Sequence, residues 1–265
     1  MIINCKEVAQ KWKDECKGTK ATLAIVQIGD NPASNSYIKG KLKDCQEIGY
    51  RGILYKINEP TTTEDILLLI EKLNYDKNTN GIIVQLPLPQ YIDEKAIINS
   101  INPIKDVDGF LPNSIFTKCT PLGVISLFKE INYNLSGKFV VVLGRSENVG
   151  KPLANLLVNE NATVAICHSK TDMKTKYALL RMADVVVSAV GCAGLFSYKD
   201  VRPNALVIDI GINRVNGHLC GDFIPPNDDS KIMYTSVPGG IGLLTRATLM
   251  KNTKIAYEMQ KNILD

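Results

Sequence analysis

Residues 144–150 could bind the phosphates of a dinucleotide. The segment reads GRSENVG, so Ser146 stands where the usual second glycine would be and the loop is one residue longer than the common pattern. A glycine turn that opens a helix presents unpaired backbone N–H groups to a pyrophosphate at the positive end of the helix dipole. Glycines at such a connection can also do no more than permit a tight turn, so the loop alone leaves both interpretations open.

The strands around this loop favour the phosphate-binding interpretation and a particular cofactor. Residues 139–143 (FVVVL) predict a buried strand, and residues 163–167 (TVAIC) predict the next one, which completes a βαβ unit. The second strand ends at His168 and Ser169, with no Asp or Glu to accept hydrogen bonds from the two ribose hydroxyls of NAD. Arg145 and the His168–Ser169 pair offer donors and positive charge for a 2′-phosphate, which predicts NADP.

Several polar residues in the first half of the chain could contact a substrate. Tyr37 and Lys41 are four residues apart in a predicted helix and share a face, although a half-buried tyrosine beside a solvated lysine would give the same spacing. Gln85 ends a predicted strand, and ligands gather at the carboxyl ends of parallel strands. Residues 105–109 (KDVDG) form a polar loop with two acids, which an ordinary solvated turn would also explain.

The elements that must position these residues alternate between strands and helices. The patterns predict strands over 21–28, 53–57, 81–86, 139–143, 163–167, 183–190 and 205–210, and helices over 4–17, 31–47, 63–73, 94–101, from 150 and from 245 to the end. Such alternation is typical of an α/β protein with parallel sheets.

Length and composition set the class of protein. A chain of 265 residues favours about two domains, and its net charge of +4 without a dense Lys/Arg run argues against a nucleic-acid partner. Seven cysteines without a CxxC pair predict reduced thiols, and with only two histidines they argue against a metal site. The N-terminus is charged where a signal peptide is apolar, and no apolar run approaches a membrane span, so we expect a cytoplasmic protein with no membrane contact.

Eight ordered segments resemble the methylenetetrahydrofolate dehydrogenase/cyclohydrolase family. They are SYIKGKLKDCQEIG at 36–49, QLPLP at 85–89, KDVDG at 105–109, CTPLG at 119–123, GRSENVGKPL at 144–153, CHSKT at 167–171, VIDIGINR at 207–214 and PGGIG at 238–242. The match is in register over nearly the whole chain, which chance does not explain.

The resemblance implies a fold and a domain organisation. We expect an α/β protein with an N-terminal α/β substrate domain, residues 1–118 plus 245–265, and a C-terminal Rossmann-type doubly wound parallel sheet, residues 119–244, with a cleft between them. The last helix would pack back on the first domain. The family also implies a homodimer built on the second domain.

The family's two reactions imply the substrate class and the cofactor. NADP-dependent oxidation converts 5,10-methylenetetrahydrofolate to the 5,10-methenyl cation, and hydrolysis then gives 10-formyltetrahydrofolate. The first step needs alignment above all, whereas the second needs proton transfer. A lysine transfers protons near neutral pH only when desolvation or nearby positive charge lowers its pKa.

Matching the family motifs position by position assigns roles to residues. Lys41 is the lysine at the folate, Tyr37 packs and hydrogen-bonds beside it, and Gln85 contacts and orients it. Asp108 accepts hydrogen bonds from the pterin ring and is preferred to Asp106 because the family pattern places it second in the pair. The other assigned residues are Pro238 and Gly239 as walls of the folate site, Arg145, Ser146 and Ser169 with His168 beside them at the 2′-phosphate, and Gly144, Gly150, Gly191 and Ile212 along the dinucleotide.

Two segments depart from the family pattern. Residues 235–245 read TSVPGGIGLLT, with Ser236 and Leu243 in place of prolines and Leu244 in place of a methionine, and residues 221–223 (GDF) are shorter than the common GDVDF. The ratio of the two activities is therefore left open.

Two other functions fit parts of the sequence. A two-domain NADP enzyme of the shikimate dehydrogenase type also has a lysine in its first domain, but it has no need of the Tyr37–Lys41 spacing together with QLPLP. A non-catalytic dinucleotide sensor would need a DNA-binding or partner-binding module, and the first half shows neither a basic recognition helix nor an exposed apolar helix stripe.

Overall fold

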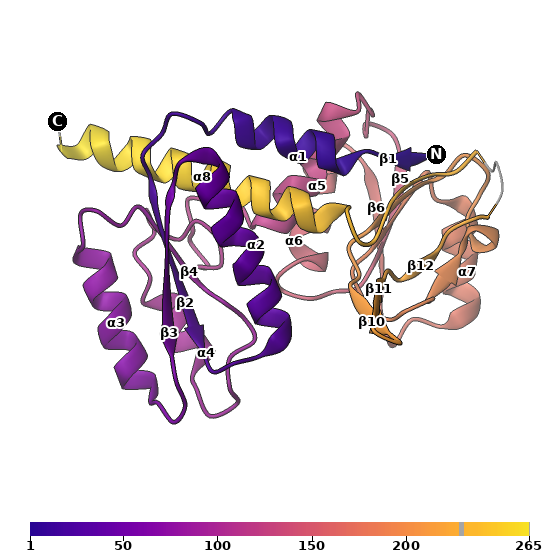
Figure 1. The fold of residues 1–265 in the computed structure, drawn as a ribbon. Helices are drawn as coiled ribbons and strands as arrows, with labels where there is room; N and C mark the ends of the chain where they lie inside the picture. The colour runs from indigo at the N-terminus through magenta and orange to yellow at the C-terminus, as the bar shows by residue number, and fades with distance from the viewer. Residues whose placement is uncertain (228–230, 265) are drawn as a thin grey trace. The chain divides into compact units, whose positions relative to one another are not determined.

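The computed structural model describes residues 1–227 and 231–264, which form two compact α/β units (Figure 1). The 10–119 unit contains Gln10–Cys119 together with the chain from Arg246 onward. The 120–245 unit contains Met1–Ala9 and Thr120–Thr245. Each unit has its own parallel sheet and its own buried core.

The 10–119 unit is built on a three-stranded parallel sheet with the order β3-β2-β4. Its strands are β2 (Thr22–Ile28), β3 (Arg51–Ile57) and β4 (Gly81–Val84). The chain leaves β2, forms the edge strand β3 and returns on the other side of β2 as β4. Since the strand order reverses beside β2, the carboxyl ends of β2 and β4 are where sheets of this kind bind ligands.

The central strand β2 contributes to two cores because successive side chains point to opposite faces. The helices around it are α2 (Pro32–Ile48), α3 (Thr63–Tyr75), α4 (Glu94–Asn99) and α8 (Ile241–Leu264), while α1 (Cys5–Asp14) precedes the strand. Leu23 and Ile25 pack with residues of α2 and α8, whereas Ala24 and Val26 pack with residues of α3 and α4. Full burial of a side chain as large as Leu23 or Ile25 stabilises the fold by about 1.5–3 kcal/mol.

Local sequence signals set the ends of α2 and α3. The Asn31 side chain accepts hydrogen bonds from two backbone N–H groups of the first turn of α2, and Pro32 occupies the first helical position. Gly49 ends the helix in the left-handed conformation with a φ of 85°. Thr62 and Asp65 form a capping box at the start of α3. The predicted start of α2 and its end near Gly49 are therefore confirmed.

The 120–245 unit contains a six-stranded parallel sheet with the order β1-β13-β9-β7-β5-β6. Its strands are β1 (Ile2–Ile3), β5 (Phe139–Leu143), β6 (Thr163–Cys167), β7 (Val185–Ser188), β9 (Leu206–Asp209) and β13 (Met233–Thr235). The chain runs from β5 to the edge strand β6 and then builds β7, β9 and β13 on the other side of β5. The doubly wound parallel sheet is confirmed, and its order reverses between β5 and β7.

Helices and short strand pairs complete this unit. They are α5 (Cys119–Glu130), α6 (Gly150–Asn159), α7 (Met173–Met182), the 3₁₀ turn Tyr198–Asp200, the parallel pair β8 (Phe196–Ser197) and β12 (Phe223–Ile224), and the antiparallel pair β10 (Asn213–Val215) and β11 (His218–Cys220). Helices α5 and α7 and the short strands were not predicted. Short strands carry too few residues for a periodic pattern.

The first nine residues group in space with residues 120–245. The reason is strand pairing, because Ile2 and Ile3 lie in register with Tyr234 and Thr235, and the Met1 ammonium donates to the Ile232 carbonyl oxygen at 2.6 Å. A two-residue edge strand has no sequence signal of its own. The assignment of these nine residues to a first domain of residues 1–118 plus 245–265 stays a prediction.

The terminal helices differ from their predicted bounds. Helix α1 ends at Asp14 rather than at residue 17, and α8 begins at Ile241 rather than at Thr245. Asp265, to which the last helix was expected to run, lies outside the described residues.

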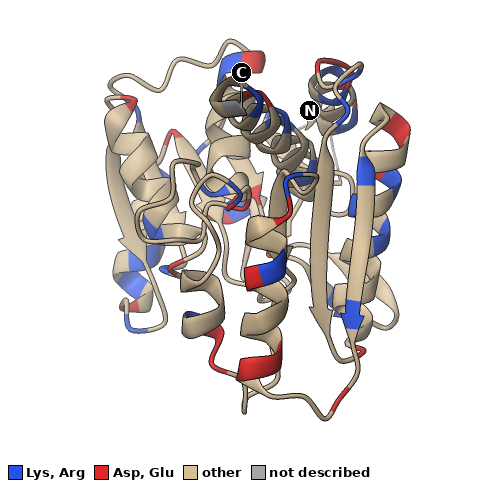
Figure 2. Ribbon diagram, turned by 90° about the vertical axis from the view of Figure 1, so that its left-hand side faces the viewer, with Lys and Arg blue, Asp and Glu red and all other residues tan. Residues whose placement is uncertain are grey.

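Figure 2 shows Lys and Arg as well as Asp and Glu scattered over the helices and loops of this view. Across residues 1–227 and 231–264, no helix combines the length and the apolar character needed to cross a membrane.

Candidate active site

Lys41 lies in a largely buried polar cluster of the 10–119 unit. Its Nζ donates a hydrogen bond to Gln85 Oε1 at 3.1 Å and lies 4.0 Å from Asp108 Oδ2. The side chains of Lys41 and Asp108 are only 10% and 13% exposed. Three predicted site residues from a helix, a strand end and a loop are therefore brought together around one ammonium group.

The sheet positions Gln85 for this contact. Its backbone N–H donates to the Val26 carbonyl oxygen at 2.9 Å, so Gln85 extends the pairing of β4 with β2 by one residue. Its side-chain Nε2 donates to the Leu86 carbonyl oxygen at 2.9 Å. That bond fixes the amide with Oε1, an acceptor, toward the Lys41 ammonium.

The charged residues of the 105–109 loop have different roles: Lys105 and Asp106 bind backbone groups, whereas Asp108 faces Lys41. Lys105 Nζ donates to three carbonyl oxygens at the end of α3, at 2.8 to 2.9 Å, and burial lowers the pKa of Lys105. The Asp106 carboxylate accepts the backbone N–H groups of Phe110 and Leu111, and burial raises the pKa of Asp106. Asp108 is thus the acid of the pair that faces Lys41.

Tyr37 lies one helical turn before Lys41 and is 38% exposed. Partial burial raises the pKa of the Tyr37 hydroxyl, and the positive charge of Arg246 opposes that shift. Within the described residues the Tyr37 hydroxyl has no hydrogen-bond partner, so the predicted bond to Lys41 is not formed in this structure. The hydroxyl stays available to a ligand.

Two charged residues near Lys41 were missed from the sequence. Asp44 follows Lys41 by three positions on α2, and its Oδ2 lies 2.9 Å from Arg246 Nε in an ion pair without hydrogen-bond geometry. Asp44 Oδ1 lies 3.4 Å from Lys13 Nζ. A Cβ at Gly40 would overlap the Arg246 guanidinium, so glycine makes room for this arginine. The i, i+3 spacing of Lys41 and Asp44 was the available signal.

Both glycines of the 144–150 loop are required by close packing. Gly144 has a φ of 110°, and a Cβ there would lie 2.6 Å from the Ala189 carbonyl oxygen. A Cβ at Gly150 would overlap the Gly144 carbonyl oxygen. The loop after β5 therefore lies against the loop after β7, at the point where the strand order of the sheet reverses.

The expectation of unpaired N–H groups in this loop is wrong for three residues. Ser146 Oγ accepts from the N–H groups of Val149 and Gly150, at 3.2 and 3.4 Å. The Lys151 N–H donates to the Ser146 carbonyl oxygen at 3.1 Å. Since Ser146 replaces the usual second glycine, its hydroxyl satisfies donors that a glycine would leave open. A phosphate at this helix terminus would compete with that hydroxyl.

The residues predicted at the 2′-phosphate follow two neighbouring strands. The Gly144 N–H donates to the Cys167 carbonyl oxygen at 2.8 Å, which joins the ends of β5 and β6. Arg145 and Ser169, the residues just beyond, are exposed. His168 Nδ1 accepts the Lys170 N–H at 3.1 Å, so a neutral His168 carries its proton on Nε2.

The remaining predicted residues also lie in the 120–245 unit. Gly191, with a φ of 74°, follows β7, and Ile212, which is 44% exposed, follows β9. Pro238 and Gly239 are exposed in the turn before α8. Their roles at the dinucleotide and the folate stay predictions.

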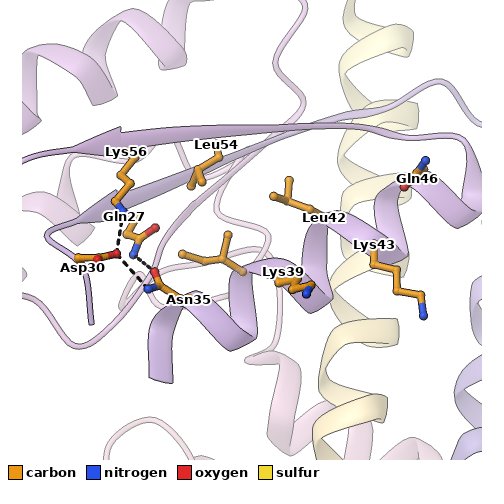
Figure 3. Close-up of a pocket in the computed structure, with 10 residues that line it drawn as sticks. Gln27, Asp30, Asn35, Lys39, Leu42, Lys43, Gln46, Leu54 and Lys56 are labelled. Atoms are coloured by element: carbon orange, nitrogen blue, oxygen red, sulfur yellow. Dashed lines mark hydrogen bonds and ion pairs between the residues drawn. The ribbon is translucent and has the colours of Figure 1, made fainter. Parts of the chain in front are cut away.

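A surface groove of about 630 Å³ runs beside α2 but contains none of the predicted site residues (Figure 3). It is lined by Gln27, Asp30, Asn35, Ile38, Lys39, Leu42, Lys43, Gln46, Leu54 and Lys56. Several of these side chains bind one another, as Asp30 does with Lys56 at 2.7 Å and with Asn35 at 3.0 Å (Figure 3). The groove is therefore separate from the cluster around Lys41.

One unit has a doubly wound sheet with a glycine turn at its reversal point, and the other α/β unit has a buried lysine. Together these features define a two-domain, dinucleotide-dependent type of enzyme. Family models assign the chain more closely. The model of the tetrahydrofolate dehydrogenase/cyclohydrolase catalytic domain matches residues 3–108, and that of the NAD(P)-binding domain of the same family matches residues 118–261. The chain belongs to the tetrahydrofolate dehydrogenase/cyclohydrolase family, which confirms the resemblance found in the eight motifs.

Individual relatives agree with this assignment. Bifunctional protein FolD of Exiguobacterium sibiricum is 44% identical over an alignment of 273 positions, gaps included, which covers 96% of this chain and 98% of that protein. The crystal structure of bifunctional FolD from Campylobacter jejuni has a TM-score of 0.92 at 38% identity and covers 98% of this chain and 99% of that one. The Trypanosoma brucei enzyme, solved with NADP cofactor and inhibitor, has a TM-score of 0.90 at 32% identity, with coverage of 98% and 97%.

The alternative of a shikimate dehydrogenase has much weaker support. Shikimate 5-dehydrogenase from Listeria monocytogenes is 11% identical with a TM-score of 0.50, a likeness of fold alone.

Proposed function

We propose that this chain oxidises 5,10-methylenetetrahydrofolate with NADP and then hydrolyses the 5,10-methenyl product to 10-formyltetrahydrofolate. It is a bifunctional methylenetetrahydrofolate dehydrogenase and methenyltetrahydrofolate cyclohydrolase, as its family membership indicates. The observation that carries the mechanism is the buried Lys41 ammonium held by Gln85 at 3.1 Å, with the Asp108 carboxylate 4.0 Å away.

The oxidation depends on how the chain holds and aligns its substrates. NADP, when bound, supplies the acceptor for the hydride that leaves the methylene carbon. The two nitrogens beside that carbon already favour loss of the hydride, so no side chain has to remove a proton first. Precise alignment of the reacting atoms can contribute about 7–11 kcal/mol to lowering such a barrier.

The residues of the reversal point fit a dinucleotide. The sites of Gly144 and Gly150 have no room for a Cβ because neighbouring backbone fills the space, which holds the β5 loop against the loop after β7 at the point where sheets of this kind bind dinucleotides. Arg145 and Ser169 are exposed at neighbouring strand ends and supply positive charge and a hydroxyl donor, which suit a 2′-phosphate. We assign Gly191 and Ile212 to the dinucleotide as well.

The hydrolysis requires proton transfer, which we assign to Lys41. Water that adds to the methenyl carbon must lose a proton, and the ring nitrogen released when the C–N bond breaks must gain one. In its neutral amine form, Lys41 can accept the first proton and, as the ammonium that results, return it to the nitrogen. Gln85 would orient the amine through its Oε1, as its contact with Lys41 Nζ supports, and we assign Asp108 to accept hydrogen bonds from the pterin ring, which has N–H donors along one edge.

One assay tests both reactions. Methylenetetrahydrofolate and NADP are added to the protein, and the methenyl absorbance is followed as it rises and then decays. We expect reduction of NADP to accompany the rise and 10-formyltetrahydrofolate to accumulate during the decay. A preparation that oxidises shikimate and leaves methylenetetrahydrofolate unchanged would contradict the proposal.

The assembly and location follow from the family rather than from single contacts. We propose that the protein acts as a homodimer in the cytoplasm, as the family resemblance implies, and that its partners are folate derivatives. Light scattering coupled to size exclusion measures the assembly directly, and a monomer at micromolar concentration would contradict the dimer.

A further inference from the structure

Asp222 is a fully buried carboxylate whose hydrogen-bond partners are all neutral donors. Its Oδ2 accepts the Ser188 hydroxyl at 2.7 Å and the N–H groups of Val190 and Gly191 at 3.0 and 3.2 Å. Its Oδ1 accepts the Cys192 N–H at 2.8 Å and the Asn213 Nδ2 at 3.0 Å. Among the described residues no cation pairs with it. A buried charge is costly, and five donors are what offsets that cost.

A second buried carboxylate fixes the position of Asp222. Asp209 Oδ1 accepts the N–H groups of Gly211 and Asp222, at 3.0 and 3.2 Å, and its Oδ2 accepts that of Phe223 at 2.9 Å. A Cβ at Gly211 would overlap the Asp222 carboxylate, and a Cβ at Gly221 would overlap the Asp209 carboxylate. Asp222 therefore packs against Gly211, which lies two residues after Asp209, and Asp209 packs against Gly221, which directly precedes Asp222. This packing fixes the backbone around both acids.

The donors to Asp222 belong to the loops beside the reversal point of the sheet. Residues 190–192 follow β7 directly, and the preceding Ala189 carbonyl oxygen is the atom that a Cβ at Gly144 would meet at 2.6 Å. Asn213 follows Ile212, a residue assigned above to the dinucleotide. Asp222 therefore binds, through one carboxylate, two segments that the proposed function places at the cofactor, while its own burial keeps it away from any ligand.

We propose that Asp222 is a positioning residue for the cofactor site, fixing residues 190–192 and Asn213 in the conformation that receives the dinucleotide. The proposal rests on the proposed function for the identity of the cofactor. It assigns Asp222 to the oxidation, which needs NADP, and not to the hydrolysis, which does not. The sequence motifs did not predict a role for Asp222.

The variant Asp222→Asn tests the proposal with almost no change in shape. The NH₂ group of the asparagine must replace one of the two carboxylate oxygens and cannot accept hydrogen bonds. In place of Oδ1 it faces the donors of Cys192 and Asn213. In place of Oδ2 it faces the donors of Ser188, Val190 and Gly191. We expect the KM for NADP in the oxidation to rise about tenfold or more, because hydrogen bonds to a buried charge are lost. The rate of hydrolysis of added methenyltetrahydrofolate is expected to stay within about twofold.

The matched control is Asp200→Asn in the same unit. Among the described residues, Asp200 accepts only from Ser197, through its backbone N–H and its hydroxyl, at 2.7 and 2.8 Å, and Asp200 lies outside the loops of the reversal point. It is expected to leave the KM for NADP unchanged. If Asp222→Asn does not fold, Asn213→Ala removes one donor and keeps the carboxylate, and a rise of about two- to threefold in that KM is expected.

Binding of NADP measured by calorimetry separates this inference from the proposed function. If the parent chain binds NADP but turns over no folate, the proposed function fails, and weaker binding by Asp222→Asn than by Asp200→Asn still supports the role of Asp222. Unchanged NADP affinity in a folded Asp222→Asn overturns the inference. Loss of both activities in equal proportion also overturns it, since that is the effect of a merely structural residue.

Discussion

The carboxylates of Asp108 and Asp222 are both largely buried, yet their surroundings are opposite. Asp108, in the 10–119 unit, faces an ammonium group 4.0 Å away, and no backbone N–H in the described part of the chain donates to it. Asp222, in the 120–245 unit, accepts five hydrogen bonds and faces no cation there. A carboxylate has about four lone-pair sites, so Asp108 keeps capacity for a ligand and Asp222, with five donors, has none left.

The same difference separates the two regions as a whole. The Lys41 ammonium and the Asp108 carboxylate have few partners among the described residues, as groups that exchange protons or bind a substrate require. Around the reversal point, glycines and backbone N–H groups define the surface and buried acids fix its shape. Side chains with remaining hydrogen-bond capacity can act on a substrate, whereas saturated ones can only hold the shape of a site.

The largest expected effect is that of Lys41→Met on the hydrolysis. Loss of the amine removes proton transfer, and the rate is expected to fall by about 10²–10⁴-fold while the fold is retained. Lys43→Met, an exposed lysine two positions along α2, is the matched control. Hydrolysis of methenyltetrahydrofolate is followed by absorbance, and a Lys41 variant that works at the parental rate would exclude Lys41 from the mechanism.

The pH dependence of stability tests the structural role of the acids in the 120–245 unit. Burial raises the pKa of Asp209 from 3.8 to about 6, so between these values the folded chain keeps a proton that the unfolded chain releases. The contribution of Asp209 is present below about pH 4, and it is lost as the pH rises through 6, which lowers the free energy of unfolding by about 3 kcal/mol.

Denaturant unfolding at pH 4 to 7 measures this contribution by comparison with Asp209→Asn. The difference between the parent and the variant is expected to shrink as the pH rises across this window. Ser188→Ala removes a neighbouring hydroxyl and no titratable group, so its difference from the parent should not follow the same course. A parent-to-Asp209→Asn difference that is constant with pH would show that Asp209 is ionised throughout.

Substituting each of the two acids of the 105–109 loop by asparagine, one at a time, sharpens the comparison within one unit. Asp108→Asn is expected to lower kcat/KM with folate substrates by about 10- to 100-fold, since a hydrogen bond to a charged group contributes about 1.5–3 kcal/mol. Asp106→Asn instead is expected to lower the free energy of unfolding by about 1–3 kcal/mol, because Asp106 holds Phe110 and Leu111. Steady-state rates and thermal unfolding of both variants measure this. The reverse pattern would assign the pterin to Asp106.

The smallest expected effect concerns the choice of cofactor. The parent is expected to prefer NADP to NAD, and Arg145→Ala to reduce the ratio of the two kcat/KM values by about tenfold, the effect of losing one charge-assisted hydrogen bond. Lys151→Ala, an exposed lysine that pairs with Glu147 on the same loop and helix, is the control. A parent that favours NAD at equal concentrations would overturn the assignment of Arg145 and Ser169.

Local patterns were enough for several parts of this protein. The apolar run at 139–143, the Asn31 cap and the end of α2 at Gly49 depend on residues within one or two turns, so a linear reading finds them. The family was also recognisable, because eight short segments carry residues that match its motifs in order. Roles of single residues, such as Lys41, came from that match and not from their spacing.

Other features depend on residues that meet only when the chain folds. The two-residue strand β1 pairs with residues more than 230 positions later, and Asp222 collects donors from positions 188 to 213. Asp106, and not Asp108, binds the backbone N–H groups of its own loop, and the Ser146 hydroxyl accepts N–H groups at the start of its helix. Both features depend on where each side chain points. The sequence by itself determined the longer strands and most of the helices, because caps and periodicity are local, and it determined the family, because the motifs are short ordered segments. Only the tertiary structure decided which polar groups are saturated and which keep capacity for a ligand, because hydrogen bonds form wherever the packed chain places donor and acceptor together.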